Sequence, residues 1–334
     1  MRARPCPFCA VGPVLITVGW LWLWLLVPFR PEAIRFHPAV ADVFAALHNV
    51  PPTELLVSFD ALSIHVPGEQ TPGGEKCGFF RAPWWHTDQG PAPTGLKHAG
   101  GGEPDYCVQG QVVLNGARSC DATLGILDGS HLHWREFFET FPAKDPRADW
   151  QQLDSANPAH VEFFTSRGCA VVRVAAPEGS MVLWDSRAMH CGVEPERGRP
   201  APYPQRMVTY VCMLPRPHPS TKGLGTLLAR RRTAYEEARV TSHHPFRWHT
   251  FPMKPRTYGE EEPDVLRPTV DPLEELPPRA RALVDGGLEY TMQVAAAQGG
   301  SRPARKRAGG GGGSGSRKRS CVVDLTADTD SDSS

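Results

Sequence analysis

The short run WWHTD at residues 84–88 carries the side chains best suited to chemistry. In an extended segment residues i and i+2 point to the same side, so His86 and Asp88 can offer an imidazole and a carboxylate to one ion. A third ligand must come from elsewhere, and His190 is the candidate because it lies just past a predicted strand, where a rigid element can place it. Two histidines and one carboxylate form the facial triad of non-haem Fe(II) oxygenases. We therefore predict a metal centre of His86, Asp88 and His190.

Arg206 follows His190 by sixteen residues and opens the next predicted strand. Its planar guanidinium can hold the distal carboxylate of 2-oxoglutarate through two parallel hydrogen bonds, which a lysine cannot reproduce. Arg197 and Arg199 compete for this role, and Arg206 is preferred because the other two lie in a loop rich in Pro and Gly. Gln109 is a further candidate for a hydrogen bond to the co-substrate.

These side chains in this order predict a dioxygenase with Fe(II) as its metal and with 2-oxoglutarate and O2 as co-substrates. Such an enzyme would hydroxylate a small organic substrate and release succinate and CO2. The alternative, from a different class, is a catalytically inactive jelly roll that serves as an interaction module through its C-terminal tail. The intact ligand set favours the enzyme.

Four stretches resemble the phytanoyl-CoA dioxygenase-like family, namely WHTDQ at 85–89, LGILDGSH at 124–131, GSMVLWDSRAMH at 179–190 and QRMVTYV at 205–211. The segment TSHHP at 241–245 also resembles a downstream motif of some members. The resemblance spans residues 30–260 and implies a double-stranded β-helix, which is a cupin-like jelly roll. It also implies that His86, Asp88 and His190 bind iron and that Arg206 anchors the co-substrate.

The chain departs from the pattern of this family at three places. Residues 194–204 resemble an inserted loop between the distal histidine and the arginine. Val208 stands where the family often has Ser, and Asp128 stands where Pro is common. These differences concern the fine geometry of the site more than its chemistry.

The elements that must position these residues are mostly short strands. Runs of β-formers separated by turn residues predict strands at 55–66, 108–114, 125–127, 170–174, 180–184 and 207–214. Strands at this density favour a mainly β fold of two sheets with flanking helices. A helix is predicted over 37–49, because Val40, Val43, Phe44 and Leu47 share one face. Aromatic residues at helical spacing predict another helix over 131–141.

Two polar clusters are interpreted as surface features. Residues 227–240 are predicted to form an exposed helix, because Arg230, Arg231 and Arg232 are more typical of a solvated face than of a binding patch. The histidines at 243, 244 and 249 have no carboxylate in helical register, which favours surface histidines over a second metal site.

The composition narrows the class of protein. The chain has 334 residues, and its 34 Pro and 32 Gly indicate many turns. Lys plus Arg and Asp plus Glu both total 36, and this zero net charge argues against nucleic acid as a partner bound by bulk charge. The nine cysteines are scattered, and several lie in apolar runs, which favours buried thiols in a reducing compartment.

Residues 1–29 form an apolar N-terminal segment. Between Val11 and Val27 the chain is uncharged, and this length is close to the lower limit of about 17 residues for a membrane-spanning helix. A membrane anchor is therefore one interpretation. A buried segment of the globular domain is another, and an incorrectly determined start of the sequence is the third.

The rest of the chain divides into three predicted parts. Residues 30–260 form the jelly-roll domain, 261–300 a weakly ordered extension, and 301–334 a disordered tail with basic clusters. The end of the tail resembles a SUMO-interacting motif through Val322, Val323 and Leu325, which could add a strand to the sheet edge of a partner. Nuclear, cytoplasmic and membrane-anchored locations all stay open.

Overall fold

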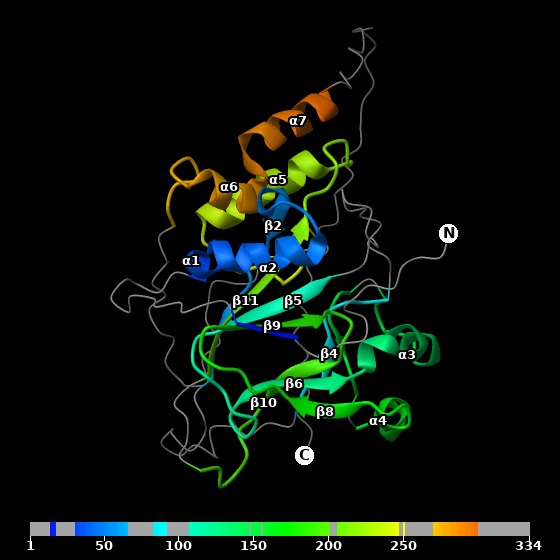
Figure 1. Cartoon of the computed structure of the whole chain (residues 1–334). Coiled ribbons are helices and arrows are strands. Elements are labelled where there is room, and N and C mark those ends of the chain that lie inside the picture. The colour runs from blue at the N-terminus through cyan, green and yellow to red at the C-terminus, as the bar shows by residue number, and fades with distance from the viewer. Residues whose placement is uncertain are drawn as a thin grey trace, which may run out of the picture. The chain divides into compact units, whose positions relative to one another are not determined.

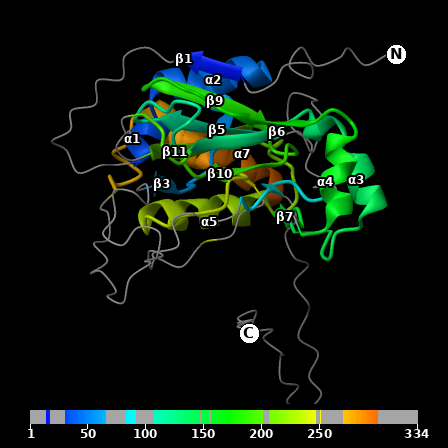
Figure 2. The same cartoon turned by 90° about the horizontal axis from the view of Figure 1, so that it is seen from below.

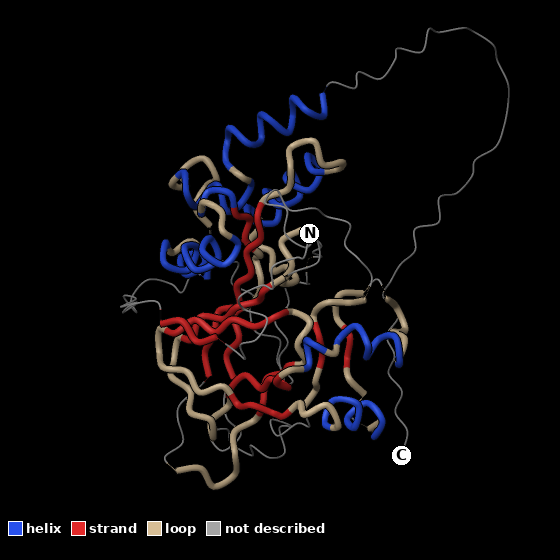
Figure 3. The backbone as a smooth tube through the Cα atoms, turned by 45° about the vertical axis from the view of Figure 1, so that its right-hand side comes forward, coloured by secondary structure: helices blue, strands red, loops and turns tan. Residues whose placement is uncertain are grey.

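The computed structural model describes residues 14–17, 31–65, 83–91, 107–146, 148–154, 156–200, 206–246, 250 and 270–299. Within these residues two antiparallel β-sheets face each other, and strands distant in sequence lie side by side in each sheet (Figure 3). This arrangement confirms the predicted mainly β, double-stranded β-helix architecture.

The larger sheet has the strand order β1-β9-β5-β11-β2, and β3 pairs with β11 beside this path. Its strands are β1 (Val14–Thr17), β9 (Ser180–Asp185), β5 (Val108–Val113), β11 (Arg206–Pro215), β2 (Leu55–Val57) and β3 (Leu62–His65). The run predicted as one strand at 55–66 is therefore two strands. The break arises because Ser58 bonds to the carbonyl of Cys212 and Phe59 bonds to the Thr241 hydroxyl, after which the chain pairs with β11 again at Thr209.

The smaller sheet has the order β7-β4-β10-β6-β8. Its strands are β7 (Gln151–Gln152), β4 (His86–Thr87), β10 (His190–Val193), β6 (Thr123–Asp128) and β8 (Ala170–Arg173). β4 has only two residues, but it pairs with β10 on one side and with β7 on the other. This short strand carries one predicted metal ligand to the strand that carries another.

Alternation along each strand sorts side chains onto two faces. On β5, Val108 and Val112 belong to the core beneath the helices, whereas Val113 belongs to the core between the sheets. Gln111 and Gln109 lie two and four residues before Val113, so they share its inward face. The other members of the core between the sheets include Leu124, Ile126, Val182, Trp184 and Val208.

The helices pack in two groups (Figures 1 and 2). One group covers the outer side of the larger sheet and comprises α1 (Pro31–Arg35), α2 (Pro38–His48), α5 (Leu224–Glu236), α6 (Pro278–Asp285) and α7 (Gly287–Gly299), with the 3-10 turn η1 (Pro52–Glu54). The other group lies beside the smaller sheet and comprises α3 (Trp134–Thr140), α4 (Pro158–Thr165) and the 3-10 turn η4 (Ser130–Leu132). The helix predicted over 37–49 is α2, which begins where the His37 ring accepts a hydrogen bond from Ala39 N–H at 3.2 Å.

Residues 278–299 differ from the predicted weakly ordered extension, because they form α6 and α7. Leu283 and Val284 are fully buried in the main core with Phe44 and Met213. The sequence of α6 has few large apolar residues, and these become buried only because α2, β2 and α5 lie against this helix. The prediction that α5 presents its arginines on a solvated face is also wrong, because Arg231 is buried.

The buried arginine of α5 is Arg231, which is 1% exposed. Its guanidinium donates to the backbone carbonyls of Val284, Pro245, Val57 and Leu283 at 2.5–3.1 Å. Arg231 therefore joins the last turn of α6 and the strand β2 to α5. From the sequence alone, an arginine in a helix with few apolar residues is expected at the surface. The burial of Arg231 depends on tertiary contacts that the sequence of the helix does not show.

Four residues of the apolar N-terminal segment, Val14–Thr17, form β1 and pair with β9. The other residues that suggested a membrane anchor lie outside the described part of the chain. None of the described helices is both long enough and apolar enough to span a membrane. The basic clusters and the SUMO-like motif at Val322, Val323 and Leu325 also lie outside the described residues.

Candidate metal centre

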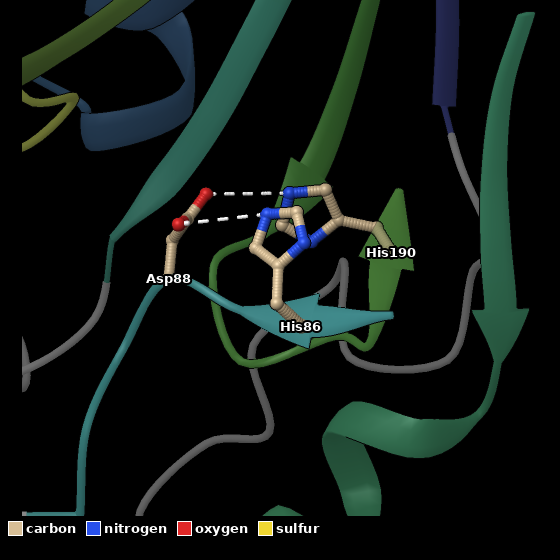
Figure 4. Close-up of side chains that lie close together, drawn as sticks. All are labelled: His86, Asp88 and His190. Carbon is tan, nitrogen blue, oxygen red and sulfur yellow. Dashed lines mark ion pairs between the residues drawn. The ribbon is translucent and has the colours of Figure 1, made fainter. Parts of the chain in front are cut away.

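The three predicted ligands meet between the sheets (Figure 4). β4 and β10 pair so that His86 lies directly opposite His190, and the two ring centroids are 4.4 Å apart. Asp88 follows β4, with its Oδ2 3.3 Å from His190 Nε2 and its Oδ1 3.7 Å from His86 Nε2. One ligand atom from each residue lies within 4.8 Å of the others, so the three can hold one metal ion.

Backbone carbonyls fix the orientation of both imidazoles. His86 Nδ1 lies 3.1 Å from the carbonyl oxygen of Trp84, and His190 Nδ1 lies 2.9 Å from that of Ala188. A carbonyl only accepts hydrogen bonds, so each Nδ1 must carry a hydrogen. In the neutral ring this leaves the lone pair on Nε2, which is the nitrogen that faces Asp88.

The protonation states suit metal binding. Burial lowers the pKa of His86 to about 4, and the neighbouring His190 adds to this effect. Burial opposes ionisation of Asp88, but attraction by His243 and by the two neighbouring ligand histidines outweighs it and holds the pKa of Asp88 below its usual range. At neutral pH the site therefore offers a neutral His86 and a carboxylate, which are the forms that bind metal.

The segment that carries Asp88 is held against the turn that precedes His190. Asp88 N–H donates to the carbonyl of Ser186 at 3.1 Å, and the Thr87 hydroxyl donates to the same oxygen at 2.8 Å. Ser186 in turn donates its hydroxyl to Gln89 at 2.5 Å. These contacts join the two motifs that are distant in sequence. They place the carboxylate before any ion is bound.

Gln109 lies beside the three residues, and its side-chain amide contacts one of the predicted ligands. Its Nε2 donates to Asp88 Oδ2 at 2.8 Å. Because a carboxylate only accepts, the amide nitrogen must face Asp88 and the amide oxygen must point elsewhere. Gln109 therefore orients the carboxylate of the metal centre.

Arg206 opens β11 and is 8% exposed. Its Nη2 donates to Gln111 Oε1 at 2.9 Å. The Arg206 guanidinium lies over β10, the strand that begins with His190. It is closest to Gly192, two residues after His190, where an added Cβ would lie 3.8 Å from Arg206 Nη1. Among the described residues no carboxylate forms an ion pair with Arg206, which leaves a buried cation available for an acidic ligand.

The competing arginines are placed differently. Arg199 is not solvated: its side chain is 3% exposed and pairs with Asp121. Asp121 also accepts two hydrogen bonds from the Arg118 guanidinium, at 2.7 and 2.9 Å, and one from the Arg118 backbone N–H at 3.0 Å. Arg197 is exposed. The inserted loop is thus tied to the β5–β6 connection by a structural ion cluster.

The interpretation of two histidines as surface residues was wrong. His243 and His244 are buried, 8% and 7% exposed, rather than on the surface. They are buried because Thr241 exchanges hydrogen bonds with Phe59 and brings this segment under the larger sheet. Gln111 and Trp184 also lie at the site, beside Arg206 and His190 respectively. Each shares the inward face of its strand with a core valine, Val113 for Gln111 and Val182 for Trp184.

Tryptophans border His86 from the outer side. Trp84 stacks on the His86 ring with centroids 4.3 Å apart, and the Trp150 centroid lies 5.8 Å away. Trp84 is 48% exposed and Trp150 is 46% exposed. The metal centre is therefore closed at the Arg206 end and bordered by half-exposed indoles at the His86 end.

No protein-family model matches the chain. A curated relative, "Ava biosynthesis cluster protein O" of Aspergillus versicolor, is 28% identical over 222 residues, which cover 65% of this chain. The chain spans 63% of the length of that relative.

Solved structures of similar fold include GlcNAc Inducible Gene 2 (DUF1479) from Candida albicans. It is 16% identical with a TM-score of 0.49, over 82% of this chain and 71% of that one. EvdO2 from Micromonospora carbonacea var. aurantiaca, complexed with 2-oxoglutarate, is 16% identical with a TM-score of 0.31, over 53% and 60%. At these values the function has to be inferred from the residues of the site itself.

Proposed function

We propose that this protein is a non-haem Fe(II)- and 2-oxoglutarate-dependent dioxygenase that hydroxylates a small organic substrate. One observation carries the proposal. The Nε2 atoms of His86 and His190 and a carboxylate oxygen of Asp88 lie within 4.8 Å of one another. Beside them lies the buried Arg206, which forms no ion pair with a carboxylate of the described residues. Two histidines and a carboxylate are the ligand set of this enzyme class. Fe(II) bound there would supply the coupled activation of O2 and 2-oxoglutarate, with succinate and CO2 as products.

His86, Asp88 and His190 are the proposed iron ligands. Each is oriented by its neighbours, the two imidazoles by backbone carbonyls and the carboxylate by Gln109. Such supports reduce the reorganisation that metal binding would require. Direct contact between Gln109 and the co-substrate stays a prediction, because the amide nitrogen of Gln109 already donates to Asp88.

Arg206 is the proposed anchor for the distal carboxylate of 2-oxoglutarate. Its guanidinium uses one donor on Gln111 and keeps further donors for a carboxylate. The side chain is buried, so the pairing would form away from bulk water, where it is strongest. The stacked Trp84 and the inter-sheet core around Trp184 limit the access of water to the ligands.

Two observations favour a small organic molecule as the substrate. The relative from Aspergillus versicolor is described as a biosynthesis cluster protein, which favours a small molecule over a macromolecule. The zero net charge also gives no support for nucleic acid. Binding of SUMO through residues 322–325 and a membrane contact of the N-terminal segment stay predictions.

The test is turnover by the full chain reconstituted with Fe(II). We expect succinate to form from 2-oxoglutarate only when iron and O2 are both present. The His190→Ala variant is expected to form none. An iron-loaded protein that binds 2-oxoglutarate but never forms succinate, with or without candidate substrates, would favour the inactive interaction module instead.

A further inference from the structure

Two buried polar atoms beside the metal centre have no hydrogen-bond partner among the described residues. They are the indole N–H of Trp184 and the amide oxygen Oε1 of Gln109. Trp184 is 6% exposed and Gln109 is 5% exposed. Leaving such a group buried and unpaired costs roughly 1–3 kcal/mol, so this donor and this acceptor beside the metal centre favour a ligand that pairs with them.

The two atoms belong to neighbouring side chains. Gln109 on β5 pairs directly with Trp184 on β9, and directly paired residues place their side chains on the same face of the sheet. That face looks into the metal centre. Gln109 bonds to Asp88, and the Trp184 ring centroid lies 5.3 Å from that of His190.

The chemistry of the pair selects the ligand group. A carboxylate would meet the Gln109 oxygen, which repels it, and an ammonium would meet the Trp184 N–H. An alkyl group would leave both atoms unpaired. A neutral hydroxyl can donate to the Gln109 oxygen and accept from the Trp184 N–H, so a single group on a bound molecule satisfies both atoms.

We propose that Trp184 and Gln109 form a subsite for a neutral hydroxyl group next to the iron ligands, and hence that the substrate carries an alcohol close to the carbon that reacts. This inference rests on the proposed function, because it assigns the ligand of the same site. The hydroxyl subsite is separate from Arg206, which is the proposed partner of the distal carboxylate of 2-oxoglutarate. The Gln109 amide links the two roles, since it orients Asp88 through nitrogen and receives the hydroxyl through oxygen.

The first test uses the ligand-free full chain. Trp184→Phe and Trp134→Phe remove the same atoms from two buried indoles, but the Trp134 N–H is paired with the carbonyl of Gln89 at 2.9 Å. We expect Trp134→Phe to lower the melting temperature more than Trp184→Phe does. An equal or larger loss in Trp184→Phe means that its N–H is already paired in the protein, and this overturns the subsite.

The second test uses 2-propanol and acetone, which are similar in size although acetone cannot donate. Both are added to the chain loaded with Mn(II) and 2-oxoglutarate, and paramagnetic relaxation of their protons reports proximity to the metal. We expect a roughly 2- to 10-fold stronger effect for 2-propanol, since one hydrogen bond has about that value. Trp184→Phe should weaken both effects, whereas Trp134→Phe, whose indole N–H is paired with Gln89, should change neither.

Each remaining outcome is decisive. Equal relaxation of both solvents in the wild-type protein, no enhancement of either, or no change in Trp184→Phe contradicts the hydroxyl subsite. Water-proton relaxation in the same samples shows whether Mn(II) is bound. A chain that does not bind Mn(II) contradicts the proposed function as well, so the two failures are distinguishable.

Discussion

Two backbone carbonyls decide which imidazole nitrogens are available at the metal centre. Because Trp84 and Ala188 accept from the Nδ1 atoms, His86 and His190 present Nε2 to the same point in space. Asp88 reaches that point from an adjacent loop, held by Gln109 and by the carbonyl of Ser186. The metal site therefore exists as a geometric arrangement before a metal enters it.

Removing a ligand should remove the metal. We expect His86→Ala, Asp88→Ala and His190→Ala each to bind less than a tenth of the wild-type iron, by a rough estimate, since an open facial triad has no ligand to spare. The measurement is iron per chain after anaerobic equilibrium dialysis. His133→Ala is the matched control, because its ring is near Glu136 and away from the centre. If one of these three variants retains the wild-type iron content, the residue replaced in it is not an iron ligand.

Arg206 should determine the affinity for 2-oxoglutarate. Losing one partner of a buried charge pair costs on the order of 2–5 kcal/mol, so Arg206→Ala should weaken binding roughly 30- to several-thousand-fold, and Arg206→Lys should restore only part of it. Isothermal titration of the Mn(II)-loaded variants measures this. Arg197→Ala, in the exposed loop, should bind normally.

Arg199→Ala separates a structural arginine from a binding one. Its partner is the buried Asp121, so the variant should lose stability and keep its affinity for 2-oxoglutarate. If Arg199→Ala loses affinity while Arg206→Ala does not, the anchor lies in the loop.

Whether a site residue could be predicted from the sequence depends on how far along the chain it lies from the residues that it contacts. His86 and Asp88 are two residues apart, and the alternation of an extended strand is enough to pair them. His190 and Arg206 follow from their positions at strand ends. The contacts that Gln111 and Trp184 make there could not be predicted, because these contacts depend on which strands pair and in which register.

At the scale of elements, the short strand β4 has the largest consequence for its length. It is two residues long and lies between β7 and β10, and through this pairing His86 comes opposite His190. A two-residue strand has no sequence periodicity of its own. The longer strands β5, β9 and β11 were predictable because buried β-formers continue over several residues.

Helix α6 is the element that its sequence describes least well. Its Leu283 is fully buried against the main core, although arginine and alanine dominate the helix. We expect Leu283→Ala to lower the free energy of unfolding by about 2–5 kcal/mol, as for other fully buried leucines. Leu288→Ala in α7, where the side chain is 62% exposed, is the control and should change it by less than about 0.5 kcal/mol. Urea denaturation of both variants measures the difference, and equal midpoints would mean that α6 is not part of the core.

For the whole molecule, stability should depend on pH through Asp60. Burial raises the pKa of Asp60 from 3.8 to about 6, against attraction by His243 and a hydrogen bond from Ala61 N–H. Between these values the folded state binds more protons than the unfolded state, so stability falls as pH rises and the loss is complete above about pH 6. The loss is at most about 3 kcal/mol.

Asp60→Asn keeps the acceptor for Ala61 and removes the charge. We expect this variant to melt at a higher temperature than the wild type at pH 7.5 and at nearly the same temperature at pH 4. Asp154→Asn is the control, because Asp154 also accepts a backbone hydrogen bond, from Ala156, but is exposed. A difference for Asp60→Asn that is the same at both pH values would contradict a buried, titrating carboxyl.

The central claim is that one site holds both Fe(II) and 2-oxoglutarate. The most direct measurement is anaerobic titration of the full chain with Fe(II) and then with 2-oxoglutarate, followed by visible absorption. A keto acid that chelates Fe(II) gives a metal-to-ligand charge-transfer band, so the band should appear at one equivalent of each in the wild type. It should be absent in His190→Ala and should require far more 2-oxoglutarate in Arg206→Ala. A wild-type protein that shows no band with both ligands present would contradict the assignment of this site.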